Sequence, residues 1–411
     1  MVYSESSDNK NYKVSRLDNG ITVVSEESHY PSNVHMGILV NVGSRDESQQ
    51  NSGALLAIKN TYLKTLKHTN ETINYGMIQM SGGEAEMEFD EETMWYNTHC
   101  FEYDATDMFR MLADCAFEPR SYLAANVARD KNRKFHKLQH HLGHYNPFGN
   151  NPQLLLTTAY GYQGLGMPKW GMESNIDNID QKLLQDFQLN NITPEKTIVV
   201  ANGVRKHEEF VDLVNSHLGV LNPARDFAHV RERSHYFGGE SRQFTESPET
   251  NVLLAYESVP WTHPLMPAFA LMHTIFGGAT GFSVGGPGKG MLNRAYRNIL
   301  RSKFYISSCE SINLHFTDSG IFGFNFTGNS AYGKNIVEDI LETFEGFRRP
   351  IDDAELNRAK NMLKRAILAN ISNQVDRLEE TARSVSYYFI DNFYLFLLFL
   401  PFFYISFPPL I

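Results

Sequence analysis

Hydrophobic and polar residues alternate on both sides of Asp18-Asn19-Gly20, in the stretch YKVSRLDNGITVVSEES. Alternation places apolar side chains on one face of an extended chain, and Asn-Gly between two such runs is a strong signal for a tight hairpin. A third apolar run, VHMGILVNV, occupies residues 34–42. The first part of the chain is therefore predicted to form three strands of a sheet.

A helical spacing follows at residues 53–66 (GALLAIKNTYLKTL), where apolar residues recur every three or four positions. Such spacing lines one face of an α-helix. The same pattern predicts helices at 72–80, 104–116, 121–142 and 180–190, and apolar or alternating runs predict strands at 84–100 and 196–201.

The second half repeats this order after a polar stretch at 225–250. We predict a strand at 251–258, a helix at 267–276, a strand pair at 309–316 and 320–327, and helices at 331–347 and 352–386. The fold class is therefore α+β, with two tandem homologous units. The predicted boundaries are 1–224 for the first unit, 225–250 for a linker, 251–386 for the second unit and 387–411 for a tail. The second unit is expected to be truncated, because no closing helix and strand follow its long helix.

The tail differs in composition from the rest of the chain, since residues 393–411 carry no charge. Nineteen uncharged residues just reach the length of a membrane-spanning helix. However, Pro401, Pro408 and Pro409 disfavour a regular helix there. We favour a truncated or misread gene end as the origin of this segment, over a membrane anchor or a divergent terminal helix.

Charge and cysteine content narrow the function classes. The formal net charge of -10 argues against a non-specific nucleic-acid binder and favours a basic partner. Three cysteines, Cys100, Cys115 and Cys309, form no CxxC pair, which excludes a disulfide framework and a zinc ribbon and suits a reducing compartment. The opening MVYSESSDNK has neither an apolar signal region nor the basic composition of a transit peptide.

A glycine-rich string, GGATGFSVGGPGKGMLNRAYRNI, occupies residues 277–299. Glycine lacks the Cβ atom that keeps a ligand away from the backbone, so such a loop can approach a ligand closely. It is not a phosphate-binding P-loop, because Ser283 stands five residues before Gly288 and Gly290 follows Lys289. Without further information, the alternative is a flexible surface loop.

FSVGGPGKGM followed by NRAYRNIL resembles the pitrilysin/insulinase family, and within it the non-catalytic subunits of mitochondrial processing peptidases. The resemblance runs from Tyr12 to Ser386 and includes NVGSRDE at residues 41–47 and LADCAFEP at 112–119. It implies two α/β-sandwich units of the pitrilysin/insulinase type, a zinc-bearing β-subunit partner, and basic amphipathic presequences as ligands. It also implies a substrate-binding loop that comprises Gly285, Gly286, Pro287, Gly288, Lys289, Gly290 and Met291.

Catalytic members of this family carry HxxEH on the first helix, where two histidines bind zinc and the glutamate acts as general base. By this resemblance the three positions fall on Leu56, Lys59 and Asn60. None of these residues suits its role, since a hydrocarbon cannot ligate zinc and an ammonium cannot act as a base. The family's third ligand is a glutamate some seventy residues later, and this chain has no Glu between Glu118 and Glu173. The prediction is that the chain has no catalytic residues, binds no metal and depends on zinc in its partner.

Two further clusters leave alternatives open. His136, His140, His141 and His144 sit at helical spacings that can hold a metal, but the following Asn146-Pro147 favours a solvated helix end. Glu84, Glu86 and Glu88 alternate on a predicted strand, so their carboxylates share one face. That face is either simply solvated or a surface that attracts the arginines of a presequence.

The resemblance therefore implies a non-catalytic subunit that recognises presequences. Its implied location is the mitochondrial matrix, and association with the inner membrane is left open. The alternative is a structural core subunit of the respiratory cytochrome bc1 complex, a related assembly. The glycine-rich loop favours the first interpretation, because a scaffold subunit needs no substrate-gripping loop.

Overall fold

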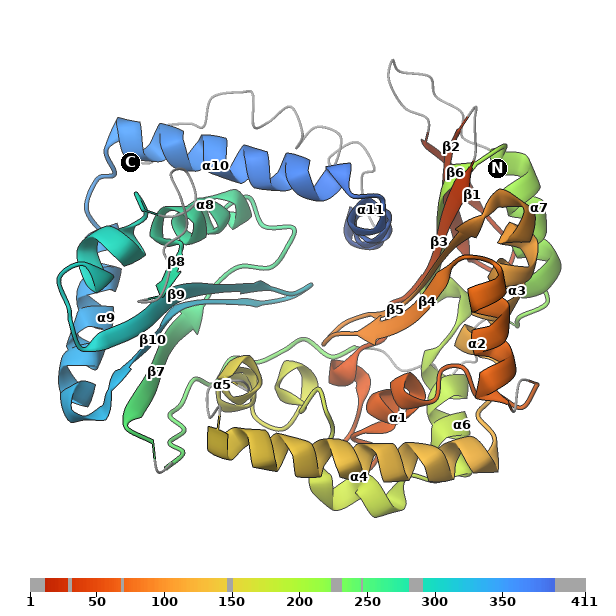
Figure 1. Ribbon diagram of the computed structural model, residues 1–411, viewed down its shortest axis with the longest axis horizontal. Coiled ribbons are helices and arrows are strands. Elements are labelled where there is room, and N and C mark those ends of the chain that lie inside the picture. The colour runs from red at the N-terminus through yellow and green to blue at the C-terminus, as the bar shows by residue number, and fades with distance from the viewer. Residues whose placement is uncertain are drawn as a thin grey trace. The chain divides into compact units, whose positions relative to one another are not determined.

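The computed structural model contains two compact units, each assembled from separate stretches of the chain (Figure 1). Unit 1 comprises residues 1–141, 160–233 and 371–391, and unit 2 comprises 142–159, 234–370 and 392–411. The structure describes residues 12–28, 32–67, 70–145, 151–222, 231–244, 247–280 and 291–388. The glycine-rich residues 285–290 and nearly all of the predicted tail lie outside the described residues.

A six-stranded mixed sheet organises unit 1, in the order β1-β2-β6-β3-β5-β4. The predicted hairpin at Asn19-Gly20 is confirmed, because β1 and β2 pair antiparallel on either side of it. Strand β6 then pairs parallel with β2 and antiparallel with β3. The strands are β1 (Tyr12–Arg16), β2 (Thr22–Glu27), β3 (Asn33–Val40), β4 (Glu84–Phe89), β5 (Met94–Phe101) and β6 (Thr197–Val204).

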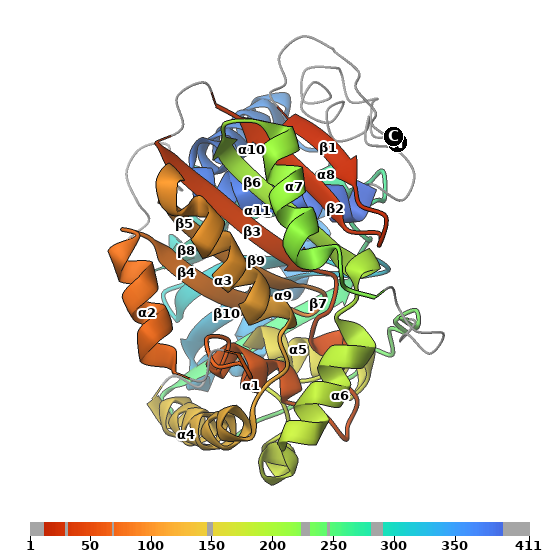
Figure 2. The ribbon, with the colours of Figure 1, turned by 90° about the vertical axis from the view of Figure 1, so that its right-hand side faces the viewer.

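Both faces of this sheet are covered. On one face Met36, Ile38 and Tyr96 belong to the main core, which also receives the apolar sides of α1, α3, α6 and α7. On the other face Leu39 and Trp95 pack against α11. The helices of unit 1 are α1 (Ala54–Asn60), α2 (Glu71–Met80), α3 (Ala105–Phe117), α4 (Tyr122–Tyr145), α6 (Gln181–Asn191), α7 (His207–Leu218) and α11 (Gln374–Tyr388). Figure 2 shows α3 and α7 lying across the strands.

Unit 2 has a four-stranded sheet in the order β7-β10-β9-β8. Its core gathers phenylalanines of β10 with apolar residues of α8 and α9. By the repeat, β7 corresponds to β3, yet β7 is an edge strand while β3 is flanked on both sides. Unit 2 thus shows no counterpart of β6 within its described residues. Its elements are α5 (Asn151–Tyr160), β7 (Glu249–Glu257), α8 (Met266–Phe276), β8 (Gly278–Thr280), β9 (Ile306–His315), β10 (Gly320–Asn329), α9 (Gly333–Phe347) and α10 (Asp353–Ser372).

The units do not follow the sequence halves. Helix α5 belongs to unit 2 although it lies in the first half, and α11 belongs to unit 1 although it lies in the second. The polar stretch predicted as a linker is also divided, since residues up to Arg233 belong to unit 1 and residues from Ser234 to unit 2. The predicted limits of the first unit at 224, of the second unit at 251 and of the tail at 387 stay predictions.

Three predicted elements were wrong in extent. The helix at 53–66 ends at Asn60, where the Thr61 backbone amide donates to the Ile58 carbonyl and the Thr61 hydroxyl donates to the Ala57 carbonyl. The strand at 84–100 is a hairpin, because the Asp90 carboxylate accepts hydrogen bonds from two backbone amides and turns the chain. The helix at 352–386 is two helices, separated at Asn373.

The sequence patterns also missed two helices, α5 and α7. No helix among the described residues has the length and apolar character needed to cross a membrane.

Candidate functional site

Helix α1 carries the positions at which the family resemblance places the zinc motif, and a buried glutamate fixes its start. The Glu47 carboxyl accepts hydrogen bonds from the backbone amides of Gly53 and Leu55, at 2.9 and 2.8 Å. These amides would otherwise lack partners in the first turn of the helix. Burial raises the pKa of Glu47 to about 8, and the amide hydrogen bonds offset only part of that effect.

Two ion pairs with buried carboxylates hold the chain that precedes α1. Arg45 pairs with Glu92, and both side chains are almost fully buried. The Asp46 carboxylate accepts from the Gly43 amide and forms two hydrogen bonds with the Arg231 guanidinium, at 2.8 and 2.6 Å. Four of the seven residues of the motif NVGSRDE therefore hold the chain at the start of α1: Gly43, Arg45, Asp46 and Glu47.

The three positions of the expected zinc motif have other structural roles. Leu56 is 2% exposed and belongs to the core of unit 1. The Lys59 ammonium forms an ion pair with the Glu88 carboxylate on β4 and lies 6.0 Å from the centre of the Trp170 ring. Lys59 therefore neutralises one of the three carboxylates of the β4 row.

Asn60 forms a contact that the sequence patterns did not reveal. Its side-chain amide donates to the Asn132 side-chain oxygen at 2.7 Å, and its backbone carbonyl accepts from the Lys131 ammonium at 2.7 Å. Asn132 lies on α4, is 1% exposed, and follows Asn60 by 72 residues. This offset matches the spacing expected for the family's third ligand, so the spacing was a usable signal for Asn132.

This donor set does not fit a zinc ion. A leucine and an ammonium supply no ligand, and the two carboxamides already bond each other. Within the part of the chain that the structure describes, no three His, Cys, Asp or Glu side chains are grouped closely enough to hold a metal ion. The arrangement around α1 is a packing and hydrogen-bonding structure.

The histidine cluster is described only at its first member. His136 makes a hydrogen bond with the Trp170 carbonyl oxygen at 3.1 Å. The side chains of His140, His141 and His144 lie outside the described residues.

The acidic row on β4 has the arrangement that alternation predicts. Glu84, Glu86 and Glu88 are exposed, while Met87 and Phe89 between and beyond them are buried. Across the hairpin, Glu84 stands opposite His99 and Glu86 opposite Asn97. The row therefore presents carboxylates on the edge strand of the sheet, and Lys59 pairs with the last of them.

The glycine-rich loop is described at its two stems. Strand β8 leads into it and pairs with β9, and Met291, the last residue of the predicted binding loop, is 42% exposed. Asn293 ties the stems together, because its side chain donates to the Gly278 carbonyl at 3.2 Å and accepts from the Tyr296 amide at 2.9 Å. A Cβ atom on Gly277 would lie 2.5 Å from the Asn293 amide nitrogen, so this approach requires glycine.

Arg294, the next residue, also holds the stem that follows the loop. Its guanidinium makes two hydrogen bonds with the Glu355 carboxylate of α10, at 3.0 and 2.7 Å, and lies 4.6 Å from the centre of the Phe347 ring. The stem that follows the loop is thus fixed to α10 and α9 of the same unit.

Comparisons with known proteins agree with this architecture. The sequence model of the insulinase family, peptidase M16, matches residues 22–145, and the model described as the peptidase M16 inactive domain matches residues 178–363. The chain is similar to the mitochondrial-processing peptidase subunit alpha of Solanum tuberosum, with 28% identity over 92% of this chain and 74% of that protein. The human subunit of the same name is 26% identical, over 91% of this chain and 74% of that protein.

A solved structure shows the same fold. One chain of the Complex III2 from Candida albicans, with Inz-5 bound, has a TM-score of 0.72 and covers 91% of this chain and 85% of its own length. The sequence identity is 17%, so this likeness concerns the fold alone.

Proposed function

The chain belongs to the peptidase M16 (insulinase) family, and from this premise we propose that it is the non-catalytic α subunit of a heterodimeric mitochondrial processing peptidase. In this role it recognises the basic presequences of imported precursors in the mitochondrial matrix. A zinc-bearing β subunit cleaves them, and this chain holds no cofactor of its own.

The observation that carries this proposal is the set of contacts made by the three motif positions on α1. Leu56 lies in the core, Lys59 pairs with Glu88, and Asn60 bonds to Asn132. These contacts satisfy the side chains at the motif positions and leave no ligand or base for hydrolysis. The similarity to α subunits over about nine tenths of the chain supports the same role.

Substrate recognition is assigned to two surfaces. The exposed carboxylates Glu84 and Glu86 offer an acidic row on one strand for arginines of a presequence. The loop Gly285–Met291 is proposed to hold the peptide, and Asn293 and Arg294 anchor its second stem. Each surface belongs to a different unit.

The test is reconstitution with an HxxEH-bearing β subunit. We expect the pair to cleave a presequence peptide, and neither chain alone to match the activity of the pair. Removing residues 285–290 is expected to weaken peptide binding by the pair about tenfold, which corresponds to ~1.4 kcal/mol. A chain in which the six residues become a Gly-Ser segment of equal length is the matched control for loop length. Unchanged affinity in both variants would exclude the loop from recognition.

A second experiment tests the motif positions themselves. The combined changes Leu56→His, Lys59→Glu, Asn60→His and Asn132→Glu place zinc-type donors on α1 and α4. The side chains of Asn60 and Asn132 already contact each other. We expect the purified variant to bind about one zinc ion per chain, measured by elemental analysis after dialysis. Asn60→His alone is the control and should retain none. If the combined variant folds and binds no zinc, these residues do not occupy the ligand positions.

The fold of the Complex III2 chain supports the second candidate, a structural core subunit of the cytochrome bc1 complex. Co-purification from mitochondria separates the two. A soluble HxxEH-bearing partner supports the peptidase subunit, and membrane-bound bc1 components support the scaffold.

A further inference from the structure

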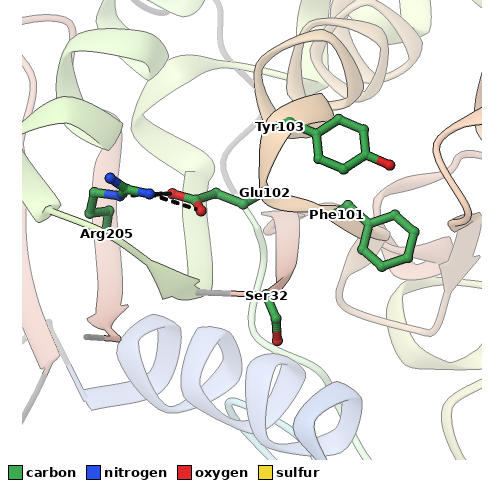
Figure 3. Close-up of a pocket in the computed structure, with 5 residues that line it drawn as sticks. All are labelled: Ser32, Phe101, Glu102, Tyr103 and Arg205. Carbon is green, nitrogen blue, oxygen red and sulfur yellow. Dashed lines mark hydrogen bonds and ion pairs between the residues drawn. The ribbon is translucent and has the colours of Figure 1, made fainter. Parts of the chain in front are cut away.

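A hollow of about 400 Å³ lies in unit 1 at the end of β5, away from the contacts of α1 (Figure 3). Its lining residues come from three separate stretches of the chain: Ser32, Phe101, Glu102, Tyr103 and Arg205. No feature of the sequence patterns pointed to it.

Two exposed aromatic rings form its apolar part. Phe101 is 46% exposed and Tyr103 is 78% exposed. The rings stack with their centres 5.7 Å apart and their planes 13° apart. Phe101 also lies against Gly82, where a Cβ atom would come within 2.7 Å of the ring. The Phe101 ring is therefore held in place while much of its surface faces water, a feature typical of binding surfaces.

The polar side of the hollow is an ion pair that costs little to break. The Glu102 carboxylate accepts from the Arg205 guanidinium at 2.9 and 3.1 Å. The Arg205 side chain is 64% exposed and that of Glu102 is 32% exposed. Exposed pairs contribute little stability, so an incoming cation can take over this carboxylate.

The first carboxylate of the acidic row on β4 lies near Phe101, as the register of the hairpin shows. His99 stands opposite Glu84 in the hairpin. Phe101 lies two residues after His99 on β5, so it is on the same face of the sheet and is the diagonal neighbour of Glu84. Sheet geometry places such diagonal neighbours roughly 7–8 Å apart. Met80, two residues before Gly82 at the end of α2, is 88% exposed. Apolar and acidic surface therefore lie side by side.

We propose that this hollow is a docking site for the apolar side chains of a basic amphipathic peptide segment. An aliphatic residue of the segment contacts Phe101 and Tyr103, and neighbouring arginines bind Glu84 and Glu102. The inference rests on the proposed function and adds a subsite to the acidic row.

Charge complementarity selects this occupant. Glu84 is the diagonal neighbour of Phe101 across the hairpin, and Asp104 directly follows Tyr103 in the chain. Arg205, the one cation among the lining residues, is paired with Glu102. An acidic peptide would be repelled by this arrangement. A second copy of the chain on the same patch would bring like charges together, which also disfavours self-association.

The test uses the full-length chain and two dye-labelled synthetic peptides. One peptide carries leucine and arginine at helical spacing, and the other has serine in place of each leucine. Binding is measured by fluorescence anisotropy for the unmodified chain and for the Phe101→Ser/Tyr103→Ser double variant. Tyr122→Ser is the matched control, because Tyr122 is 68% exposed on another part of unit 1.

The leucine peptide is expected to bind the double variant about tenfold more weakly than the unmodified chain, since buried aromatic contacts dominate such interfaces. The serine peptide should bind both equally, and Tyr122→Ser should change neither. Thermal unfolding checks that the double variant is folded, and Tyr103→Phe should retain binding.

Each outcome bears on one proposal. If the double variant binds the leucine peptide as tightly as the unmodified chain, the hollow is not the subsite. If Glu84→Gln/Glu86→Gln still weakens both peptides in that case, the proposed function stands without it. If neither peptide binds the unmodified chain, alone or with the β subunit, both proposals fail. A double variant that alters only the sedimentation of the chain alone would identify a second copy as the occupant and overturn the inference.

Discussion

Both units use an arginine-glutamate pair to hold the segment beside their proposed binding surface, but they bury it to different degrees. In unit 1, Arg45 and Glu92 are 2% and 4% exposed. In unit 2, Arg294 and Glu355 are each 15% exposed. A fully buried pair has given up its hydration, so the loss of one partner costs more there than in a pair that water partly reaches.

The difference matches what each segment supports. The pair in unit 1, with Asp46 and Glu47, fixes α1 and the turn that joins β4 to β5, the hairpin that carries the acidic row. In unit 2, Asn293 and Arg294 fix only the stems of the loop. Unit 1 therefore offers fixed charges, and unit 2 offers an anchored loop.

The largest effect is expected from Arg45→Ala. It removes one cation from the buried Glu92 carboxylate, and should lower the free energy of unfolding of unit 1 by about 3–5 kcal/mol. Urea unfolding is followed by fluorescence in a Trp261→Phe background, where the signal comes from Trp95 and Trp170 of unit 1. A loss below about 1 kcal/mol would mean that water reaches the pair.

Arg294→Ala should cost less, about 1–3 kcal/mol, because Glu355 can regain water. We expect faster hydrogen exchange in the π-helical turn Ala295–Leu300 and in α10, with α1 unchanged. Arg294→Lys is the control, since it keeps the charge but loses the two-bond geometry. Equal losses for Arg294→Ala and Arg45→Ala would remove the difference between the units.

Glu47 should make unit 1 less stable as pH rises. In the unfolded chain its carboxyl loses the proton near 4.5, while in the fold burial raises the pKa to about 8. Between these values the folded state binds more protons, so stability falls with increasing pH by up to about 1.4 kcal/mol per unit. Glu47→Gln should remove this slope, measured as urea midpoints from pH 5 to 8. Parallel curves for the two proteins would show that Glu47 is already ionised in the fold.

The smallest effect is expected from Asn293→Ala, which removes hydrogen bonds to both loop stems. A loss of ~1–2 kcal/mol should appear as faster hydrogen exchange in β8 and in Ala295–Leu300. Asn298→Ala, at an exposed position of the same turn, is the matched control. If the two variants behave alike, Asn293 does not anchor the loop.

Local patterns anticipated much of the fold. The Asn19-Gly20 hairpin, the acidic row of β4 and helices α2, α3 and α6 follow from alternation and helical spacing. The extent of other elements escaped these patterns, because single side chains decided it. Thr61 ends α1 and Asp90 turns the β4–β5 hairpin through hydrogen bonds that apolar periodicity does not encode.

By itself, the sequence determined the repeated α+β order, the family resemblance and the lack of zinc-type side chains at Leu56, Lys59 and Asn60. Only the tertiary structure decided that Asn132 meets Asn60, that α5 and α11 join units outside their own half, and that Phe101 and Tyr103 border a hollow with Arg205. Periodicity reports how each residue relates to its near neighbours. Contacts between residues far apart in the chain depend on how the sheets and helices pack, which no local pattern contains.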